Sequence, residues 1–190
     1  MFKVNDTVVF PAHGVARVSD VIEKMVGTLS VKFFKLSFVY SDMTMLIPCY
    51  GASTSGVRYL SSPKDIDDAV EFLTRLPIKP RSTTEFAPSG WAKRQKEYQL
   101  RIQVGKVMDL AGIYRDLMSL SLTKELSFGE KGLLGTVESL LVQEVIESCG
   151  RKREDIVAQL REPFQRFAVG GATLVEGREN RLSPNSSPQA

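Results

Sequence analysis

Ser61-Ser62-Pro63-Lys64-Asp65 is the stretch at which the chain changes from β-type to helical patterning. Ser62 is a residue type favoured at the N-cap of a helix, and Pro63 suits the first helical position. Asp65 lies three residues past the cap. The pattern predicts a helix that runs to about Leu76 and buries one face, made of Ile66, Ala69, Val70 and Leu73.

The residues before this stretch are typical of β structure. Runs of β-branched and aromatic residues, the longest at 31–40, are separated by turn signals at 11–14 and 41–42. Four or five short strands in about sixty residues predict a small antiparallel barrel, because closure removes exposed strand edges. The segment Met43–Pro48 is short and apolar and ends in proline. Its pattern fits an edge strand open to a partner and an interior barrel strand equally well.

The residues after this stretch are helical in pattern. The expected helices, after the first, span 91–103, 107–122, 128–147 and 154–167. Gly105 ends the second, Ser127 and Glu130 form a capping box for the fourth, and the fifth must bend or end near Pro163. The buried positions of the third helix should be Val107, Leu110, Ala111, Tyr114, Leu117 and Met118, and those of the fourth Leu134, Val137, Leu141 and Val145.

The expected fold class is therefore α+β. A small antiparallel β barrel at 1–60 is followed by an all-helical domain at 61–168. Residues 77–90 carry several prolines with Ser and Thr and are expected to form a loop. Gly, Ser, Pro and Asn dominate from residue 170, which predicts a disordered tail at 169–190.

Composition indicates an ordinary cytoplasmic protein. Of 190 residues, 43% are hydrophobic and 25% are charged. No apolar run approaches the roughly 20 residues that a membrane helix needs, and the alternating N-terminus does not resemble a signal peptide. Cys49 and Cys149 share no metal-type spacing and are expected to be reduced thiols. We expect a monomer, because no heptad seam or long apolar edge is left unassigned. For lack of a membrane-length apolar run, we expect no membrane partner.

Enzyme motifs are scarce in this sequence. The single histidine, His13, lies in a turn signal, where a hydrogen bond to backbone explains it better than catalysis does. The acids Asp65, Asp67 and Asp68 fall in the first turn of a predicted helix, where they complement its dipole. No glycine-rich phosphate loop is present. We therefore expect a binding protein without catalytic residues, metal or cofactor.

The strongest functional signal surrounds the one tryptophan, in Ser89-Gly90-Trp91-Ala92-Lys93-Arg94-Gln95-Lys96. The net charge of the chain is only +3, yet residues 79–115 carry eight basic and three acidic residues. Such a local excess favours a polyanionic partner. An aromatic body among cations suits a surface that meets phosphates with charge and bases with a ring. An equally weighted alternative is a tryptophan that folds back onto the helical core beneath a solvated basic face.

An ordered set of residues over about 1–150 resembles the CarD-like (CdnL) bacterial transcription regulators. The set comprises Phe2-Lys3-Val4-Asn5-Asp6-Thr7-Val8-Val9-Phe10-Pro11-Ala12-His13-Gly14, Asp42-Met43-Thr44, Ile47-Pro48, Trp91, Lys93, Arg94, Lys96, Gly105, Val107, Arg115-Asp116-Leu117, Leu126-Ser127, Gly129-Glu130-Lys131, Leu141-Val142 and Glu144. The resemblance implies a Tudor-like N-terminal domain, similar to that of transcription-repair coupling factors, which docks on the RNA polymerase β subunit. It also implies a helical domain that reaches promoter DNA in a protein associated with the nucleoid.

The resemblance also implies roles for individual residues. Trp91 matches the family's tryptophan, which wedges into the minor groove at the upstream edge of the melted bubble and so stabilises the open complex. The matching backbone contacts are Lys93, Arg94, Lys96 and Lys131. Polymerase binding falls to Lys24 and to the strand Met45, Leu46, Ile47 and Pro48. Leu46 is a departure, because family members often carry an arginine there.

Two other classes of function are compatible with the residues. Small β barrels of this kind also bind RNA, so the chain could be an RNA- or ribosome-associated protein. It could also be a protein–protein adaptor in which Trp91 is buried in the helical core.

Overall fold

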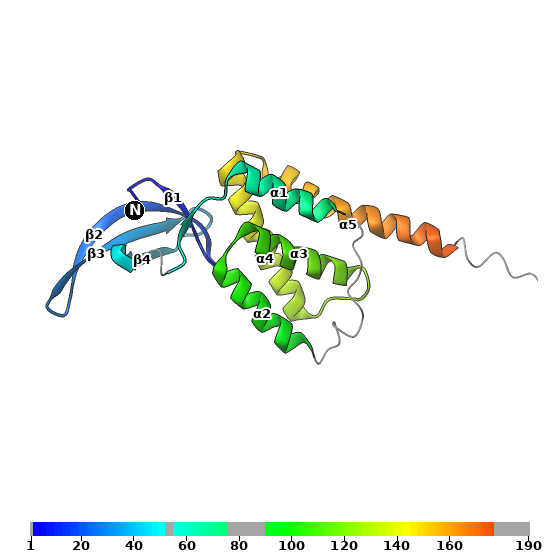
Figure 1. The fold of residues 1–190 in the computed structure, drawn as a ribbon, viewed down its shortest axis with the longest axis horizontal. Helices are drawn as coiled ribbons and strands as arrows, with labels where there is room; N and C mark the ends of the chain where they lie inside the picture. Colours follow the sequence, from blue (N-terminus) through cyan, green and yellow to red (C-terminus); the bar gives the residue numbers. More distant parts are fainter. Residues whose placement is uncertain (1, 52–54, 76–89, 177–190) are drawn as a thin grey trace, which may run out of the picture.

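The computed structural model describes residues 2–51, 55–75 and 90–176 and has an antiparallel sheet followed by helices (Figure 1). The strands are β1 (Thr7–Phe10), β2 (Gly14–Val26), β3 (Leu29–Phe38), β4 (Thr44–Pro48) and β5 (Arg58–Tyr59). A short 3-10 helix, η1 (Cys49–Gly51), follows β4. The α-helices are α1 (Pro63–Thr74), α2 (Trp91–Val104), α3 (Val107–Ser121), α4 (Phe128–Cys149) and α5 (Arg153–Glu176). The predicted α+β class and its order along the chain are confirmed.

The sheet is open, so the predicted closure into a barrel is wrong. Its strand order is β4-β3-β2-β1-β5, and in the described residues β4 pairs only with β3 while β5 pairs only with β1. The physical reason is that β5 has only two residues and offers too few backbone groups for a second partner. The strand predicted at Met43–Pro48 is thus an edge strand, β4, and the interior alternative is excluded.

The long hairpin of β2 and β3 forms the body of the sheet. The two strands pair over Ala16–Val26, with a register shift between Val18 and Asp20. One face of the sheet carries the buried cluster Val8, Ala16, Val18, Phe34, Leu36, Phe38, Ile47 and Val57. Towards Gly27 the hairpin projects beyond its neighbours, and its side chains become exposed.

Helix α1 begins where the sequence predicted. Ser62 and Asp65 form a capping box, and Pro63 occupies the first turn. The predicted buried residues of α1 are all buried, Leu73 being 1% exposed. The helix ends at Thr74, and Leu76 with the loop predicted at 77–90 lies outside the described residues, except for Gly90.

The remaining helices start as predicted, and two of them extend further. Gly105 ends α2 in the left-handed region, and the capping box of Ser127 and Glu130 opens α4. Met118 and Leu134 are only partly buried, unlike the other residues predicted for the cores of α3 and α4. Helix α5 contains Pro163 and continues to Glu176, so its predicted end near Phe167 is wrong and the predicted tail begins inside a helix. Residues 177–190 are not described.

The helices share one core, separate from that of the sheet. It draws buried side chains from α1 to α5, including Ile66, Ile102, Tyr114, Val142 and Phe164. Tyr114 and Phe164 meet edge to face with ring centroids 6.0 Å apart. In the part of the chain that is described, no helix is long and apolar enough to span a bilayer.

Candidate nucleic-acid interface

Trp91 is the first residue of α2 and is partly buried against the helical core. Its indole lies beside the first turn of α4, where a methyl group added to Gly129 would be 3.4 Å from Cζ2 of the ring. The indole is therefore neither enclosed in the core nor free in solvent. Of the two placements expected from the sequence, packing of Trp91 on the helical core is the one observed, although the residue as a whole is only partly buried.

Arg94 and Glu130 hold this indole from one side. The guanidinium carbon of Arg94 lies 5.8 Å from the centroid of the Trp91 ring, within range of a cation–π interaction. Nη2 of Arg94 lies 3.3 Å from Oε1 of Glu130, and their side chains are only 12% and 2% exposed. A buried pair of this kind fixes geometry more than a surface pair does, because both groups have lost their water.

Glu130 joins this pair to the start of α4. Burial raises the pKa of Glu130, but hydrogen bonds from Ser127 and Lys124 outweigh it and hold the pKa below its usual value. The carboxylate accepts from the backbone N–H of Ser127 at 2.9 Å and lies 3.2 Å from Nζ of Lys124. Trp91, Arg94, Glu130 and the α4 capping box thus form one connected cluster, which we call the indole cluster.

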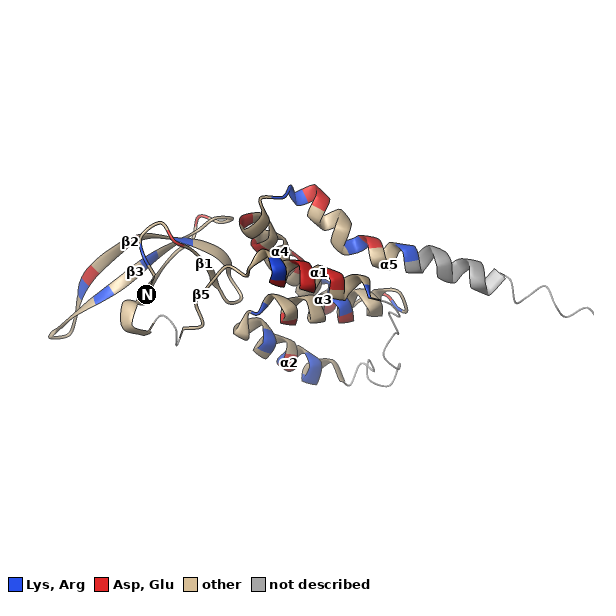
Figure 2. Cartoon of the chain, turned by 45° about the horizontal axis from the view of Figure 1, so that its top comes forward, with Lys and Arg blue, Asp and Glu red and all other residues tan. Residues whose placement is uncertain are grey.

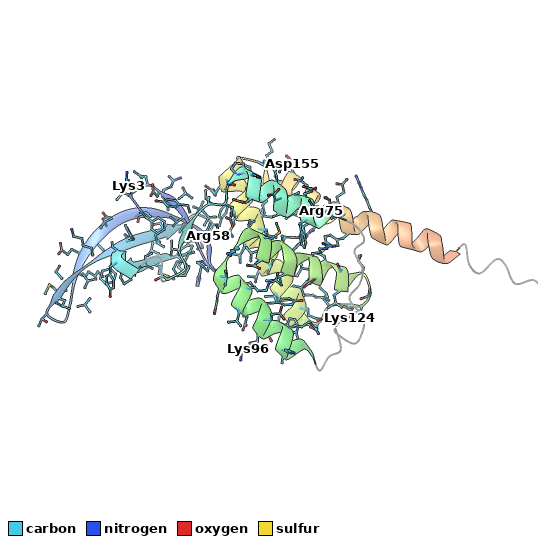
Figure 3. All side chains as sticks on the ribbon, viewed as in Figure 1. Lys3, Arg58, Arg75, Lys96, Lys124 and Asp155 are labelled. Atoms are coloured by element: carbon cyan, nitrogen blue, oxygen red, sulfur yellow. The ribbon has the colours of Figure 1, made fainter. Side chains whose placement is uncertain are left out.

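The predicted lysine contacts surround the indole cluster. Lys93 and Lys96 lie three residues apart on the exposed side of α2, which Figures 2 and 3 show as a basic helix with Lys96 pointing outward. Lys131, on α4, is 56% exposed and pairs with Glu125 at 2.7 Å. Arg94 differs from these lysines because its side chain is only 12% exposed and lies against the indole and Glu130.

Phe128 is an exposed aromatic residue beside the indole cluster that we did not predict. It is 94% exposed, is the first residue of α4 and precedes Gly129, at which an added Cβ would lie 3.4 Å from the indole. Helical phase could have found it, since at 3.6 residues per turn Phe128 points about 180° away from Val137, which is 0% exposed.

The residues predicted to bind polymerase lie on the sheet, and only some of them are accessible. Ile47 is 4% exposed and Met45 packs on the sheet core, whereas Leu46 is 37% exposed. Pro48 is partly buried, and Lys24 is exposed on β2. The side chain of Ile47 is therefore structural.

The register of the sheet places Lys24 and Leu46 on one face. Leu46 is opposite Lys35 on β3, and Lys24 is opposite Val31 on the same strand. Positions 31, 33 and 35 alternate with the buried positions 34 and 36, so they point to the other side. This face, which we call the outer face, carries Lys24, Lys35 and Leu46. Lys35 was not singled out in the sequence.

Arg58 and Glu144 join the sheet to the helices. Two nitrogens of Arg58, on β5, lie 2.6 and 2.8 Å from the two carboxylate oxygens of Glu144, on α4. Glu144 also accepts from the backbone N–H of Ser61 at 2.9 Å, and Nε of Arg58 donates to the carbonyl of Gly105 at 2.9 Å. The Glu144 side chain is 1% exposed. These bonds tie β5, the α1 cap region, α2 and α4 at one junction.

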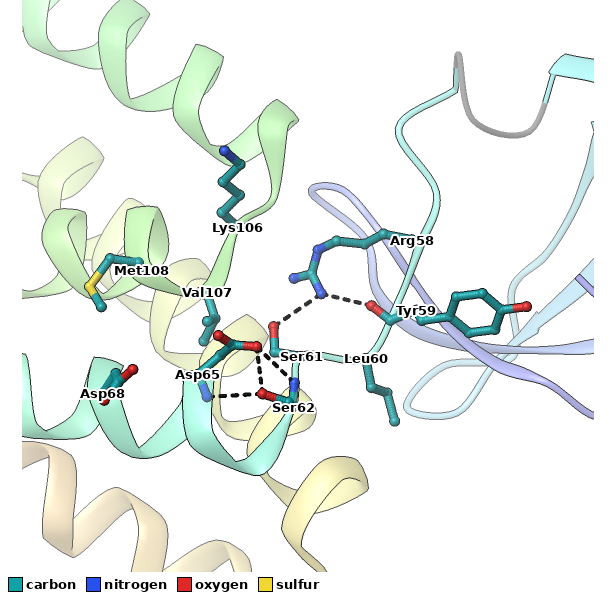
Figure 4. Close-up of a pocket in the computed structure, with 10 residues that line it drawn as sticks. All are labelled: Arg58, Tyr59, Leu60, Ser61, Ser62, Asp65, Asp68, Lys106, Val107 and Met108. Carbon is teal, nitrogen blue, oxygen red and sulfur yellow. Dashed lines mark hydrogen bonds between the residues drawn. The ribbon is translucent and has the colours of Figure 1, made fainter. Parts of the chain in front are cut away.

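A hollow of about 510 Å³ opens beside this junction, lined by Arg58, Tyr59, Leu60, Ser61, Ser62, Asp65, Asp68, Lys106, Val107 and Met108 (Figure 4). Two of its four charged side chains already make hydrogen bonds: Asp65 accepts from Ser62, and Arg58 donates to Ser61 and to the carbonyl of Tyr59. Asp68 and Lys106 complete the charged part of the lining.

Other candidate chemistry in the described residues is structural. Nδ1 of His13 lies 3.0 Å from the carbonyl oxygen of Pro11, so a backbone hydrogen bond explains this histidine as predicted. Cys49 and Cys149 are free thiols. Over the described ranges, no group of three His, Cys, Asp or Glu residues could hold a metal ion.

Comparison with known proteins assigns both parts of the chain. Residues 2–60 match the CarD-like/TRCF RID domain family, and residues 80–161 match the family described as CarD, C-terminal domain. YdeB of Bacillus subtilis (strain 168), assigned provisionally as a transcription factor, is 23% identical over 145 residues, which is 76% of this chain and 90% of that protein. The resemblance read from the sequence is confirmed, and the chain belongs to the CarD-like family of transcription regulators.

Proposed function

We propose that this protein binds RNA polymerase through the outer face of its sheet and stabilises the open promoter complex by wedging Trp91 into the minor groove at the upstream edge of the bubble. The observation that carries the proposal is the indole cluster: a partly exposed tryptophan is fixed by Arg94 and by the first turn of α4, beside exposed lysines. The RID match supports a polymerase-binding sheet. The protein then works in the cytoplasm at the nucleoid.

A fixed indole suits a wedge better than a mobile one does. Its orientation is set before DNA arrives, so less conformational freedom is lost on binding. A ring that fits only a widened groove binds melted DNA better than closed duplex, and a ligand shifts an equilibrium by its difference in affinity for the two states. Unstacking a base step costs a few kcal/mol, part of which the indole offsets by stacking.

The outer face also accounts for the departure at Leu46. The arginine that relatives often carry there is missing, but the cross-strand neighbour of Leu46 is Lys35, an exposed cation on the same face. Side chains directly opposite in an antiparallel pair are about 5 Å apart at Cβ. Lys35 therefore presents positive charge close to the place that an arginine at 46 would occupy.

This docking model is tested by reversing the charge of Lys35. We expect Lys35→Glu to weaken binding to an isolated fragment of the RNA polymerase β subunit by about tenfold or more, because charged groups at an interface steer and orient association. Binding is measured by titration at a fixed, stated salt concentration.

Lys32→Glu is the matched control, because Lys32 is exposed on the same strand but alternates to the opposite face. Its effect should stay below about threefold. Equal losses in the two variants would indicate a nonspecific charge effect and would contradict docking by the outer face. No binding of the wild-type chain to any β fragment would remove the polymerase half of the proposal.

A second test concerns Lys93 and Lys96. Each is proposed to contact phosphate without reading sequence, and neutralising one phosphate contributes about 0.9 to the slope of log affinity against log salt. The double variant Lys93→Ala and Lys96→Ala should therefore lower that slope by about 1 to 2 and weaken all promoters alike. Lys152→Ala, which removes an exposed lysine ahead of α5, is the control.

A loss confined to some promoters would contradict this test, because it would mean that the lysines read bases. Tighter binding of structured RNA than of duplex promoter DNA in direct competition would contradict promoter DNA as the partner and would favour an RNA-associated function instead.

A further inference from the structure

Phe128 is the most exposed large hydrophobic side chain among the described residues, at 94%. Burial of a phenylalanine side chain is normally favourable by about 1.5–3 kcal/mol, so a partner that covers this ring gains binding free energy. Other strongly exposed residues of this kind lie on the sheet part, such as Tyr50 at 88% and Leu29 at 69%, and on α2, where Leu100 is 57% and Val104 54% exposed. Phe128 is the most exposed of those on the helical part and lies next to the indole cluster.

The backbone under Phe128 is held firmly. Ser127 and Glu130 close a capping box around it: Oγ of Ser127 accepts from the N–H of Glu130 at 3.3 Å, and Glu130 accepts from the N–H of Ser127 at 2.9 Å. Glu130 is anchored in turn by Arg94 and Lys124. These bonds hold the backbone at Phe128 in place within the indole cluster. The Phe128 ring takes part in none of them.

Phe128 and Trp91 begin two helices that meet at their first turns. Gly129, the next residue after Phe128, lies beside the indole: a Cβ added to it would be 3.4 Å from Cζ2 of Trp91. Two aromatic residues are therefore presented at the N-terminal ends of α2 and α4, where helix dipoles favour anions. In the described part of α2, the first turn carries no acid and no side-chain cap.

The charges around Phe128 identify the class of partner. Lys124, 39% exposed, precedes it by four residues, and Lys131, 56% exposed, follows it by three. The pair of Lys131 with the 86% exposed Glu125 is weak in water, so this lysine can turn to a phosphate at little cost. An apolar ring framed by cations fits a duplex, since phenylalanine is one of the side chains that wedge between base steps in the minor groove.

We infer that Phe128 is a second DNA-inserting side chain, which enters the same minor groove as Trp91 and lengthens the hydrophobic wedge. This inference rests on the proposed function and deepens it. The two rings come from different helices, so together they contact more of the distorted groove than one ring does. Phe128→Ala should shorten the lifetime of the open complex by about 3- to 10-fold, because the DNA covers only part of the ring.

The test compares open-complex lifetimes with wild-type protein, Phe128→Ala, Trp91→Ala and Leu100→Ala. Leu100 is the control because it is a 57% exposed apolar residue of α2 outside the indole cluster. Phe128→Ala should leave the Tm within about 2 °C of wild type, as expected for a surface side chain without packing, so a loss of fold does not confuse the result. Binding to the β-subunit fragment should also be unchanged.

A crosslink identifies the occupant directly. With Phe128→p-benzoylphenylalanine in the full promoter complex, photocrosslinks to DNA at the upstream edge of the bubble are expected. A crosslink to polymerase, or between two copies of this chain, would overturn the inference. So would a lifetime with Phe128→Ala equal to wild type while Trp91→Ala shortens it, and in that case the proposed function would stand. If neither variant shortens the lifetime, the proposed function itself fails, and the inference fails with it.

Discussion

Replacing Trp91 with alanine is expected to shorten the lifetime of the open promoter complex by about 5- to 100-fold. The figure follows from the roughly 1–3 kcal/mol that stacking of a base on an aromatic side chain contributes. Affinity for the polymerase β fragment should be unchanged, because Trp91 and the outer face belong to different parts of the chain. The measurement is decay of competitor-resistant complexes on a promoter whose open state is short-lived.

Packing of the indole on the helical core, one of the two placements expected from the sequence, adds a cost to stability when Trp91 is replaced. Trp91 packs on the helical core beside Gly129, so the alanine variant should also lose about 1–2 kcal/mol of unfolding free energy. Trp91→Leu separates the two effects, since leucine keeps apolar packing but lacks a flat ring. The leucine variant should fold nearly as well as wild type yet fail to prolong the open state. Wild-type lifetimes with both variants would refute the wedge.

Replacing Glu144 with alanine is expected to lower the free energy of unfolding by about 3–5 kcal/mol. This is the usual cost of removing one partner from a buried ion pair, because the remaining charge is left without compensation. Arg58 would lose both carboxylate contacts, and the backbone N–H of Ser61 would lose its acceptor. Denaturant unfolding measures the change.

Glu71→Ala is the matched control for Glu144→Ala. Glu71 pairs with Arg75 at 2.9 Å, but their side chains are 59% and 69% exposed, so we expect a loss below about 1 kcal/mol. The double variant Arg58→Met with Glu144→Leu should recover much of the stability lost by Glu144→Ala, since apolar replacement of a whole buried pair is often tolerated. Similar losses of unfolding free energy for the Glu71 and Glu144 variants would show that the buried ion pair at the junction stabilises the fold no more than a surface pair does.

Local signals in the sequence predicted much of the fold. The caps at Ser62 and Ser127 and the stop at Gly105 depend on a few adjacent residues, and each helix begins or ends where they place it. Local signals could not decide whether the sheet closes into a barrel, because closure depends on which strand edges meet. The prediction of a closed barrel was therefore wrong. The length of α5 was also missed, since Pro163 and the glycines at 170–171 argue locally against a helix that the structure nevertheless continues.

The candidate site shows the same difference between features set by adjacent residues and features set by distant ones. Trp91 and its lysines were visible as a composition signal, but the partners that orient them are distant in sequence. Arg94 meets Glu130 36 residues later, and Arg58 meets Glu144 86 residues later. Pairing over such separations depends on how helices pack. The outer face required the strand register, without which Lys35 could not be matched to Leu46.

The junction of Arg58, Glu144 and Ser61 joins the strands to the helices through several hydrogen bonds, including one from Arg58 to Gly105 at the end of α2. If this junction holds in the proposed complex, the distance from the anchored sheet to Trp91 stays the same on every promoter. The base step that Trp91 meets would then be set by the position of polymerase and would be the same one at every promoter. Promoters would differ in their response because that step opens more or less readily, and no consensus sequence would be needed.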